Sequence, residues 1–98
     1  MDLDLIHKTL ACPFRREVLA WLKTPDEGFA RERMGFSKGV SSGAIHARSG
    51  LSQSTVSAHL ALMVEAGLVT SERVGQWMFV SRNEGTIRAF AEEIVARL

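Results

Sequence analysis

Several features that would indicate other kinds of protein are missing from this chain of 98 residues. It has a single cysteine, Cys12, so an intrachain disulfide is impossible and a reducing compartment is expected. The first residues, Met1–Asp4, are acidic and lack the basic-then-apolar order of a signal peptide. No apolar stretch approaches the roughly 18 residues of a membrane span. We therefore expect a cytoplasmic protein with no membrane association.

The chain also lacks excess charge and recognisable catalytic motifs. Its 12 Lys and Arg residues nearly balance 11 Asp and Glu residues, and the isoelectric point near 8.0 is below the value of about 9 that favours nucleic-acid binding. It has no Gly-rich phosphate loop, no nucleophile elbow and no recognisable pair of carboxylates. With 46% hydrophobic residues, we expect one folded domain over residues 1–98, neither an enzyme nor a cofactor-binding protein.

The stretch from Gly50 to Val69 is the most informative part of the sequence. It reads as a turn, a helix capped by Ser52, a glycine stop and a strand. Apolar residues spaced by four and three positions predict one buried stripe, at Val56, Leu60 and Met63. The rest of this helix carries small or hydrogen-bonding side chains, namely Gln53, Ser54, Thr55, Ser57, Ala58, His59 and Ala61. Because such a face can approach another surface closely, it is typical of a helix that reads the DNA major groove.

The segments on either side complete a mainly α pattern with a small β-hairpin. Helices are predicted over residues 3–10, from Pro13 to about residue 23, from Ser41 or Ser42 through Arg48, and over 84–98. The second of these would bury Phe14, Val18, Trp21 and Leu22, with Arg15, Arg16 and Lys23 facing away. Strands are predicted over 68–73 and 77–81. This order is that of a winged helix-turn-helix, with the helix-turn-helix at about 41–66 and the wing at about 68–81.

Residues 24–40 show no clean period and are unusually long for a loop in a compact domain. The segment mixes apolar with basic side chains, at Phe29, Met34, Phe36, Arg31 and Arg33. One interpretation is a peripheral loop whose apolar side chains cover the edge of the core. The other is a flap that covers an apolar effector pocket beside Trp21, or that brings its two arginines to flanking DNA.

Together these motifs resemble the arsenic-repressor (ArsR-like) family of bacterial transcription regulators. The resemblance is carried by residues 10–19, 50–60 and 65–69 and by Arg73–Trp77 in the wing, and it covers nearly the whole chain except 24–40. It implies a homodimer that binds a palindromic operator in double-stranded DNA and represses until an effector releases it. On this model the DNA contacts are made by Gln53, Ser54, Thr55, Ser57 and His59, with Arg73 and Gln76 on the wing. His59 could instead pack against the core.

The first and last helices carry more apolar side chains than so small a core can use. These are Leu3, Ile6, Leu10, Ile87, Phe90, Ile94 and Leu98. We expect them to form the dimer interface of the two helices at 3–10 and 84–98. A two-fold dimer would place two reading helices about one DNA turn apart, roughly 34–36 Å.

The metal sites of the family lack their ligands in this chain. Where metal-sensing relatives place a Cys-x-Cys pair, the chain has Ser41 and Gly43, and residues 84–98 contain no histidine. The remaining candidate ligands have no ligand spacing, and they are His7, His46, His59 and Cys12. We therefore expect no metal site and an effector that is a small molecule of another kind.

Two other functions stay open. Cys12 stands just before Pro13 at a helix N-terminus, where a thiol can become reactive and sense oxidants, although free cysteines are commonly small buried hydrophobes. The near-neutral charge also permits a winged helix that binds another protein. The polar face around Ser54 and Ser57 favours DNA over a protein partner.

Overall fold

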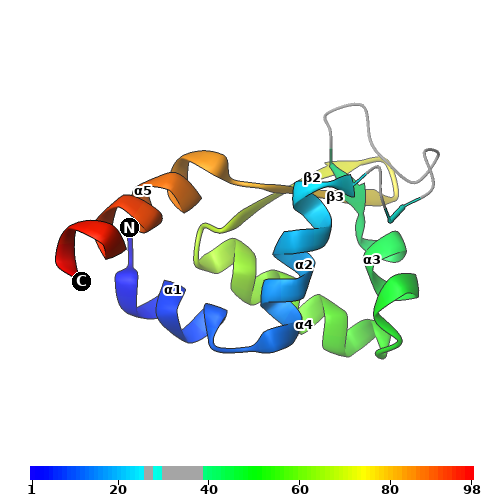
Figure 1. Ribbon diagram of the computed structural model, residues 1–98. Helices are drawn as coiled ribbons and strands as arrows, with labels where there is room; N and C mark the ends of the chain where they lie inside the picture. Colours follow the sequence, from blue (N-terminus) through cyan, green and yellow to red (C-terminus); the bar gives the residue numbers. More distant parts are fainter. Residues whose placement is uncertain (26–27, 30–38) are drawn as a thin grey trace.

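The computed structural model describes residues 1–25, 28–29 and 39–98. Within them the elements follow the order α1 (Leu3–Leu10), α2 (Pro13–Lys23), β1 (Val40–Ser41), α3 (Ser42–Ser49), α4 (Gln53–Glu65), β2 (Val69–Val74), β3 (Trp77–Arg82) and α5 (Glu84–Arg97) (Figure 1). The predicted winged helix-turn-helix, mainly α with a small β element, is confirmed. The interpretations of Arg31, Arg33, Met34 and Phe36 concern residues outside the described ones.

Short polar side chains fix where most of the helices begin. Asp2 accepts a hydrogen bond from the backbone N–H of Leu5 at 3.0 Å, and Ser41 and Ser52 do the same for α3 and α4 at 3.2 Å each. Such bonds satisfy N–H groups that have no partner inside the helix. Gly50 ends α3 with a φ of +71°, a left-handed conformation that favours glycine. The predicted cap at Ser52 is thus confirmed, and of the two candidates Ser41 and Ser42 it is Ser41 that caps α3.

The sheet has a third strand that the sequence did not predict. Strand β3 lies in the centre and pairs antiparallel with β2 on one side and β1 on the other. The hairpin pairs Val74 with Trp77 at its tip, and β1 places Val40 opposite Val80. The prediction of a two-stranded hairpin was therefore incomplete. The hairpin is part of a three-stranded sheet, in which β1 joins the segment before α3 to the wing.

The core lies where α2, α3 and α4 meet the sheet. Its buried side chains are Ile6, Val18, Leu19, Leu22, Val40, Ala44, Ile45, Val56, Leu60, Met63, Ala66, Leu68, Val69 and Val80. The predicted stripe of α4 is therefore confirmed. In α2 the prediction was partly wrong, since Leu19 is buried while Phe14 and Trp21 are only half-buried.

Helix α5 extends away from this core. The molecule measures 41 × 25 × 24 Å, and α5 runs out beyond the sheet so that both chain ends lie at one end (Figure 1). None of its residues is buried. Ile87 and Phe90 pack against the edge of the core, and the Phe90 ring meets His7 of α1 at 5.2 Å between centroids. Val95 and Leu98 are 82% and 97% exposed, so much of the apolar stripe is uncovered in the single chain.

One residue predicted at the dimer interface belongs to the core instead. Ile6 is wholly buried within its own chain, so it has no surface to offer a partner. Leu3 and Leu10 on the same helix are half-buried. Among the described residues no helix is long and apolar enough to cross a membrane.

Candidate nucleic-acid interface

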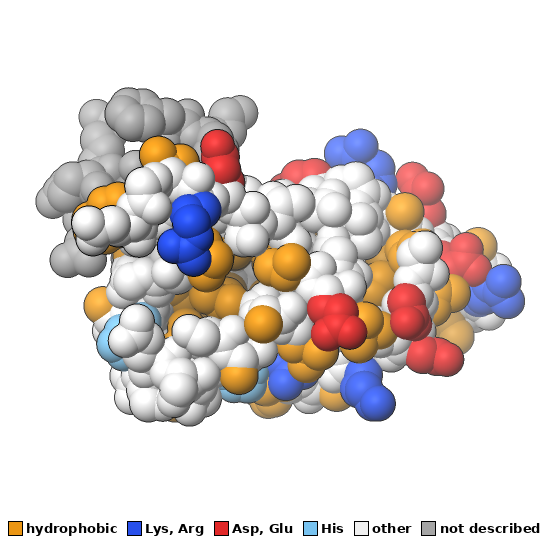
Figure 2. Space-filling model, turned by 180° about the vertical axis from the view of Figure 1, so that it is seen from behind, with side chains coloured by type: hydrophobic (Ala, Val, Ile, Leu, Met, Phe, Trp, Pro, Cys, Tyr) orange, Lys and Arg blue, Asp and Glu red, His pale blue; other side chains and the backbone are white. Residues whose placement is uncertain are grey.

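The first half of α4 presents a row of short, exposed side chains. Gln53, Ser54, Thr55 and Ser57 are all exposed. The hydroxyl groups of the first turn also contact one another, since Ser52 donates to the Thr55 hydroxyl at 2.8 Å and lies 3.3 Å from that of Ser54. Seen from behind, the surface over α3 and α4 is mostly uncharged, whereas acidic and basic side chains gather towards α5 (Figure 2). Short, uncharged polar side chains are therefore exposed along the first half of α4.

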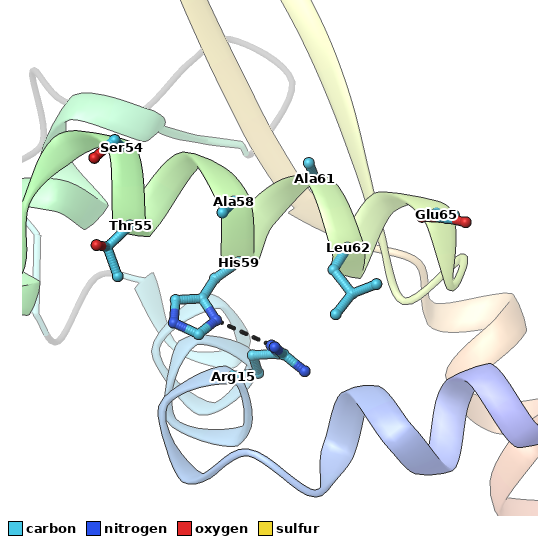
Figure 3. A pocket seen from close by; sticks show the side chains of 8 residues that line it. All are labelled: Arg15, Ser54, Thr55, Ala58, His59, Ala61, Leu62 and Glu65. Atoms are coloured by element: carbon cyan, nitrogen blue, oxygen red, sulfur yellow. Dashed lines mark hydrogen bonds between the residues drawn. The ribbon is translucent and has the colours of Figure 1, made fainter.

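A broad, open hollow of about 620 Å³ runs beside α4. It is lined by Arg15, Ser54, Thr55, Ala58, His59, Ala61, Leu62 and Glu65 (Figure 3). All of these residues except Arg15 belong to α4, and Arg15 reaches the hollow from the first turn of α2. We call this hollow the α4 groove. It brings together three predicted DNA contacts, Ser54, Thr55 and His59, with an arginine that the sequence did not assign to a site.

His59 packs against α2 rather than standing free. Its Nδ1 accepts a hydrogen bond from Nε of Arg15 at 3.0 Å, and its ring lies 5.0 Å from that of Phe14 between centroids. Burial, and secondly the positive charge of Arg15, lower the pKa of His59 below its ordinary value of 6.5. At neutral pH the imidazole is therefore uncharged, with its Nδ1 lone pair engaged and its proton on Nε2.

The interpretation that Arg15 faces away from the buried side of α2 was wrong. Besides its bond to His59, its Nη1 donates to the backbone carbonyl of Thr9 at 3.3 Å. The side chain is thus half-buried and connects α1, α2 and α4. Helical periodicity gives the direction of a Cβ atom but not the reach of a guanidinium.

An aromatic cluster continues from Phe14 along α2. The Phe14 and Trp21 rings are 6.0 Å apart, and those of Trp21 and Phe29 are 6.3 Å apart, both edge to face. The guanidinium of Arg48 lies 4.4 Å from the Trp21 ring centroid and 5.1 Å from that of Phe29, within the range of cation–π attraction. Phe29 thus covers the edge of the core. For this one side chain, that is what we expect if residues 24–40 form a peripheral loop.

The wing exposes the polar residues expected of it. Arg73 and Gln76 are both exposed, and Gly75 has a φ of +61° in the turn between the strands. Val74 and Trp77, which face each other in register, are 50% and 57% exposed. The large exposed ring of Trp77 was not singled out by the sequence pattern, because an aromatic residue next to a turn normally indicates a strand.

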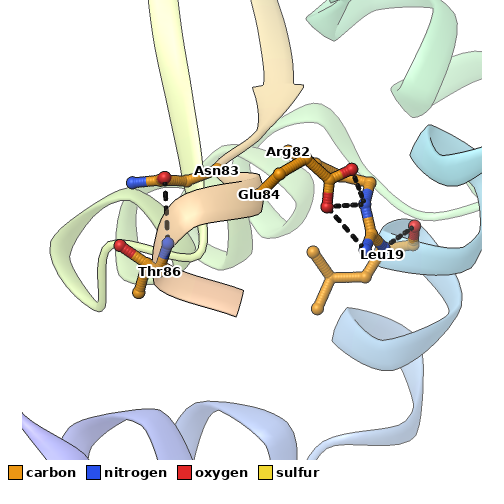
Figure 4. A network of polar contacts seen from close by, with 5 residues as sticks. All are labelled: Leu19, Arg82, Asn83, Glu84 and Thr86. Carbon is orange, nitrogen blue, oxygen red and sulfur yellow. Dashed lines mark hydrogen bonds and ion pairs between the residues drawn. The ribbon is translucent and has the colours of Figure 1, made fainter. Parts of the chain in front are cut away.

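Where β3 passes into α5, Arg82 holds three elements together (Figure 4). Its Nε and Nη2 donate to the Glu84 carboxylate at 3.0 to 3.2 Å, and its Nη1 donates to the carbonyl of Leu19 in α2 at 3.1 Å. The side chain of Arg82 is 14% exposed and that of Glu84 is 59% exposed. The hydrogen bonds from Arg82 lower the pKa of Glu84 below its ordinary value of 4.5. Asn83, the residue after Arg82, caps α5, because its side-chain Oδ1 accepts a hydrogen bond from the backbone N–H of Thr86 at 3.2 Å.

Cys12 precedes α2 and makes no side-chain cap. The thiol is half-buried, and its pKa is lowered from 9.0 chiefly by the backbone N–H of Arg15, with smaller contributions from the Phe14 N–H and the charges of Arg15 and Arg16, while burial opposes the shift. Among the described residues, no group of three or more His, Cys, Asp and Glu side chains lies together in a way that could hold a metal ion.

Comparison with known proteins places this arrangement among DNA-binding regulators. The model of the family described as "Bacterial regulatory protein, arsR family" matches residues 43–71, which include α3 and α4. A protein of Bacillus subtilis (strain 168), the uncharacterized HTH-type transcriptional regulator YbzH, is 34% identical over 89 residues, 89% of each chain.

Solved structures share the fold. HlyU from Vibrio cholerae N16961 is 26% identical with a TM-score of 0.66, covering 92% of this chain and 84% of its own. The homodimeric winged helix-turn-helix DNA-binding domain of Mb0332 from Mycobacterium bovis, a possible ArsR-family regulator, is 25% identical with a TM-score of 0.66, covering 96% of this chain and 76% of its own. The chain therefore belongs to the arsR family and is a DNA-binding transcriptional regulator of the winged helix-turn-helix type.

Proposed function

We propose that the protein is a homodimeric repressor that binds a palindromic operator and is released from it by a non-metal effector. The observation that carries this proposal is the outer face of α4, on which Gln53, Ser54 and Ser57 are exposed and no long charged side chain intervenes before Glu65. A helix of about 10–12 Å diameter fits a major groove about 12 Å wide, and short outer side chains let its backbone approach the base edges closely.

The chemistry of these side chains suits base edges. An amide such as that of Gln53 can pair with adenine through two hydrogen bonds, while hydroxyls such as those of Ser54, Thr55 and Ser57 can donate or accept. Arg73 and Gln76, exposed on the wing, would reach the phosphate backbone or the minor groove.

The uncovered stripe of α5 supports the dimer. Ile87, Phe90 and Ile94 are half-buried and Leu98 is exposed, so a second copy has apolar surface to cover on this helix. The Mb0332 domain, which has the same fold, is homodimeric. Helix α1, which carries the half-buried Leu3 and Leu10, begins at the same end of the molecule as α5 (Figure 1), and these two residues would extend the interface.

A gel shift with the DNA upstream of the gene, combined with measurement of the mass in solution, tests this proposal. A salt-dependent, sequence-selective shift by a dimer is expected. Ile94→Asp should give monomers and weak DNA binding, because a carboxylate would be buried unpaired in the interface. Ala96→Asp is the matched control, since Ala96 is exposed and two helical positions turn it to the far side of α5. A dimeric Ile94→Asp variant would refute the interface. A wild-type dimer that shifts no DNA would favour binding to another protein.

The Cys12 thiol supports a second candidate, control by oxidation. The thiol is half-buried and its pKa is lowered, which raises its reactivity towards mild oxidants. If oxidation releases the operator, peroxide should weaken DNA binding by the wild type and leave a Cys12→Ala variant unaffected. Equal DNA binding by both proteins after peroxide, with the added oxygen confirmed by mass on Cys12, would exclude this candidate.

A further inference from the structure

One wall of the α4 groove is the guanidinium of Arg15, which enters from α2 beside His59, and the predicted DNA contacts Ser54 and Thr55 line the same groove (Figure 3). We infer that Arg15 contacts a DNA phosphate next to α4 and that His59 is the positioning residue that holds its guanidinium there. This inference rests on the proposed binding of α4 to the major groove. It gives His59 a role in DNA binding without a base contact of its own.

The Arg15 guanidinium has N–H donors that are not used in the contacts described above. Arginine carries five N–H donors. Within the described residues Arg15 uses one at Nε for His59 and one at Nη1 for the Thr9 carbonyl, which leaves three for another partner. The ion pairs found there join Arg82 to Glu84 and Arg97 to Glu93, so Arg15 has no carboxylate partner in that part of the chain. A phosphate accepts hydrogen bonds from a guanidinium better than from any neutral donor.

The position of Arg15 in its helix also supports a phosphate contact. It stands in the first turn of α2, which contains no acidic residue and also carries Arg16. Positive side chains are unfavourable at the positive end of a helix dipole. The Arg16 guanidinium turns back to the carbonyl of Leu10 at 2.6 Å, whereas that of Arg15 lines the groove. A phosphate there would offset the unfavourable charge.

His59 fixes the direction in which Arg15 points. Its neutral Nδ1 is an acceptor at 3.0 Å, and the contact of its ring with Phe14 limits its rotation. Arg15 is the charged group that acts on the imidazole, while Glu65 lines the same groove further along α4. Without this acceptor a long side chain would sample several rotamers, and ordering it on DNA would cost conformational entropy.

Salt dependence of DNA binding tests the phosphate contact. The measurement is fluorescence anisotropy with a labelled duplex of arbitrary sequence, about 30 base pairs long so that it spans two neighbouring major grooves. Arg15→Gln should lower the salt slope by about 0.9 per protomer, or about 1.8 per dimer. The wild type would then lose about 12-fold more affinity than the variant between 50 and 200 mM salt, since a fourfold change raised to the power 1.8 is about 12. Arg16→Gln, the matched control in the same turn, should change the slope far less.

The role of His59 is tested by two substitutions of different chemistry. His59→Asn keeps an oxygen acceptor near the position of Nδ1 and should keep the wild-type slope. His59→Leu keeps an apolar contact with Phe14 but removes the acceptor, so it should lose much of the Arg15 contribution to the salt slope while the protein stays folded. Equal slopes for the Asn and Leu variants would overturn the positioning role, even if the Arg15 contact stands.

A measurement on the wild type guards against variants that fold poorly. The side-chain Nε–H resonance of Arg15, assigned from its loss in Arg15→Lys, should shift when the duplex is added. An unmoved resonance, or a salt slope that is unchanged in Arg15→Gln, would refute the inference while leaving DNA binding by α4 intact. A wild type that binds no duplex at all would refute the proposed function itself.

Discussion

Replacing Arg82 by methionine should destabilise the protein much more than neutralising its partner Glu84. Methionine keeps the aliphatic stem of a side chain that is 14% exposed but removes the hydrogen bond to the Leu19 carbonyl together with the ion pair. A hydrogen bond from a charged donor contributes about 1.5–3 kcal/mol, and an exposed ion pair about 0.2–1 kcal/mol. Arg82→Met should therefore cost about 2 kcal/mol or more, whereas Glu84→Gln should cost less than about 1 kcal/mol.

Thermal unfolding followed by circular dichroism measures the difference. For a domain of this size, about 2 kcal/mol corresponds to a fall in Tm of roughly 8–16 °C, and the protomer concentration must be held constant because dimerisation raises Tm. Equal losses for Arg82→Met and Glu84→Gln would refute the reasoning, since the Leu19 bond would then contribute nothing.

The ion pair between Arg82 and Glu84 also predicts how the stability of the fold changes with pH. The pKa of Glu84 is lowered in the folded chain, so the ionised carboxylate adds stability above its ordinary pKa of 4.5 that is lost as the pH falls through the folded value. The stability difference between wild type and Glu84→Gln should therefore disappear in acid.

Three further predictions concern DNA binding. Combining Ser54→Ala with Ser57→Ala should weaken specific binding by about 1–3 kcal/mol for each lost base contact at unchanged Tm, and unchanged operator affinity in a gel shift would remove both residues from the site. Arg73→Gln should weaken binding about equally across sequences and lower the salt slope by about one per wing; altered sequence preference at the same slope would instead show base reading. Salts of Zn, Cd, Ni or Cu should leave operator affinity unaltered, and a stoichiometric metal lost on chelation together with DNA binding would contradict this.

The sequence predicted the elements whose signals are local. The stripe of Val56, Leu60 and Met63, the cap at Ser52 and the helix over 84–98 each depend on spacings within one segment, and the structure confirms all three. Strand β1 escaped prediction because two residues, Val40 and Ser41, are too few to show alternation. They become a strand only by pairing with β3.

The candidate site was predictable in part for the same reason. The exposed polar residues of α4 follow from its period, but the contact of Arg15 with His59 joins residues 44 positions apart. No local pattern encodes such a pair, which depends on how α2 crosses α4. Ile6 shows the converse limit, because an apolar residue on a short helix fits a core and an interface equally well until its exposure is known.

Helix α5 bears on how the proposed repressor would respond to its own abundance. Helix α5 has no fully buried residue in its own chain, so much of its apolar surface would be covered only when two copies meet, in a pairing governed by mass action. The concentration of dimer then rises with the square of the protomer concentration while monomers predominate. Operator occupancy would accordingly change steeply over a narrow range of expression, and dilution at cell division would itself act as a derepressing signal.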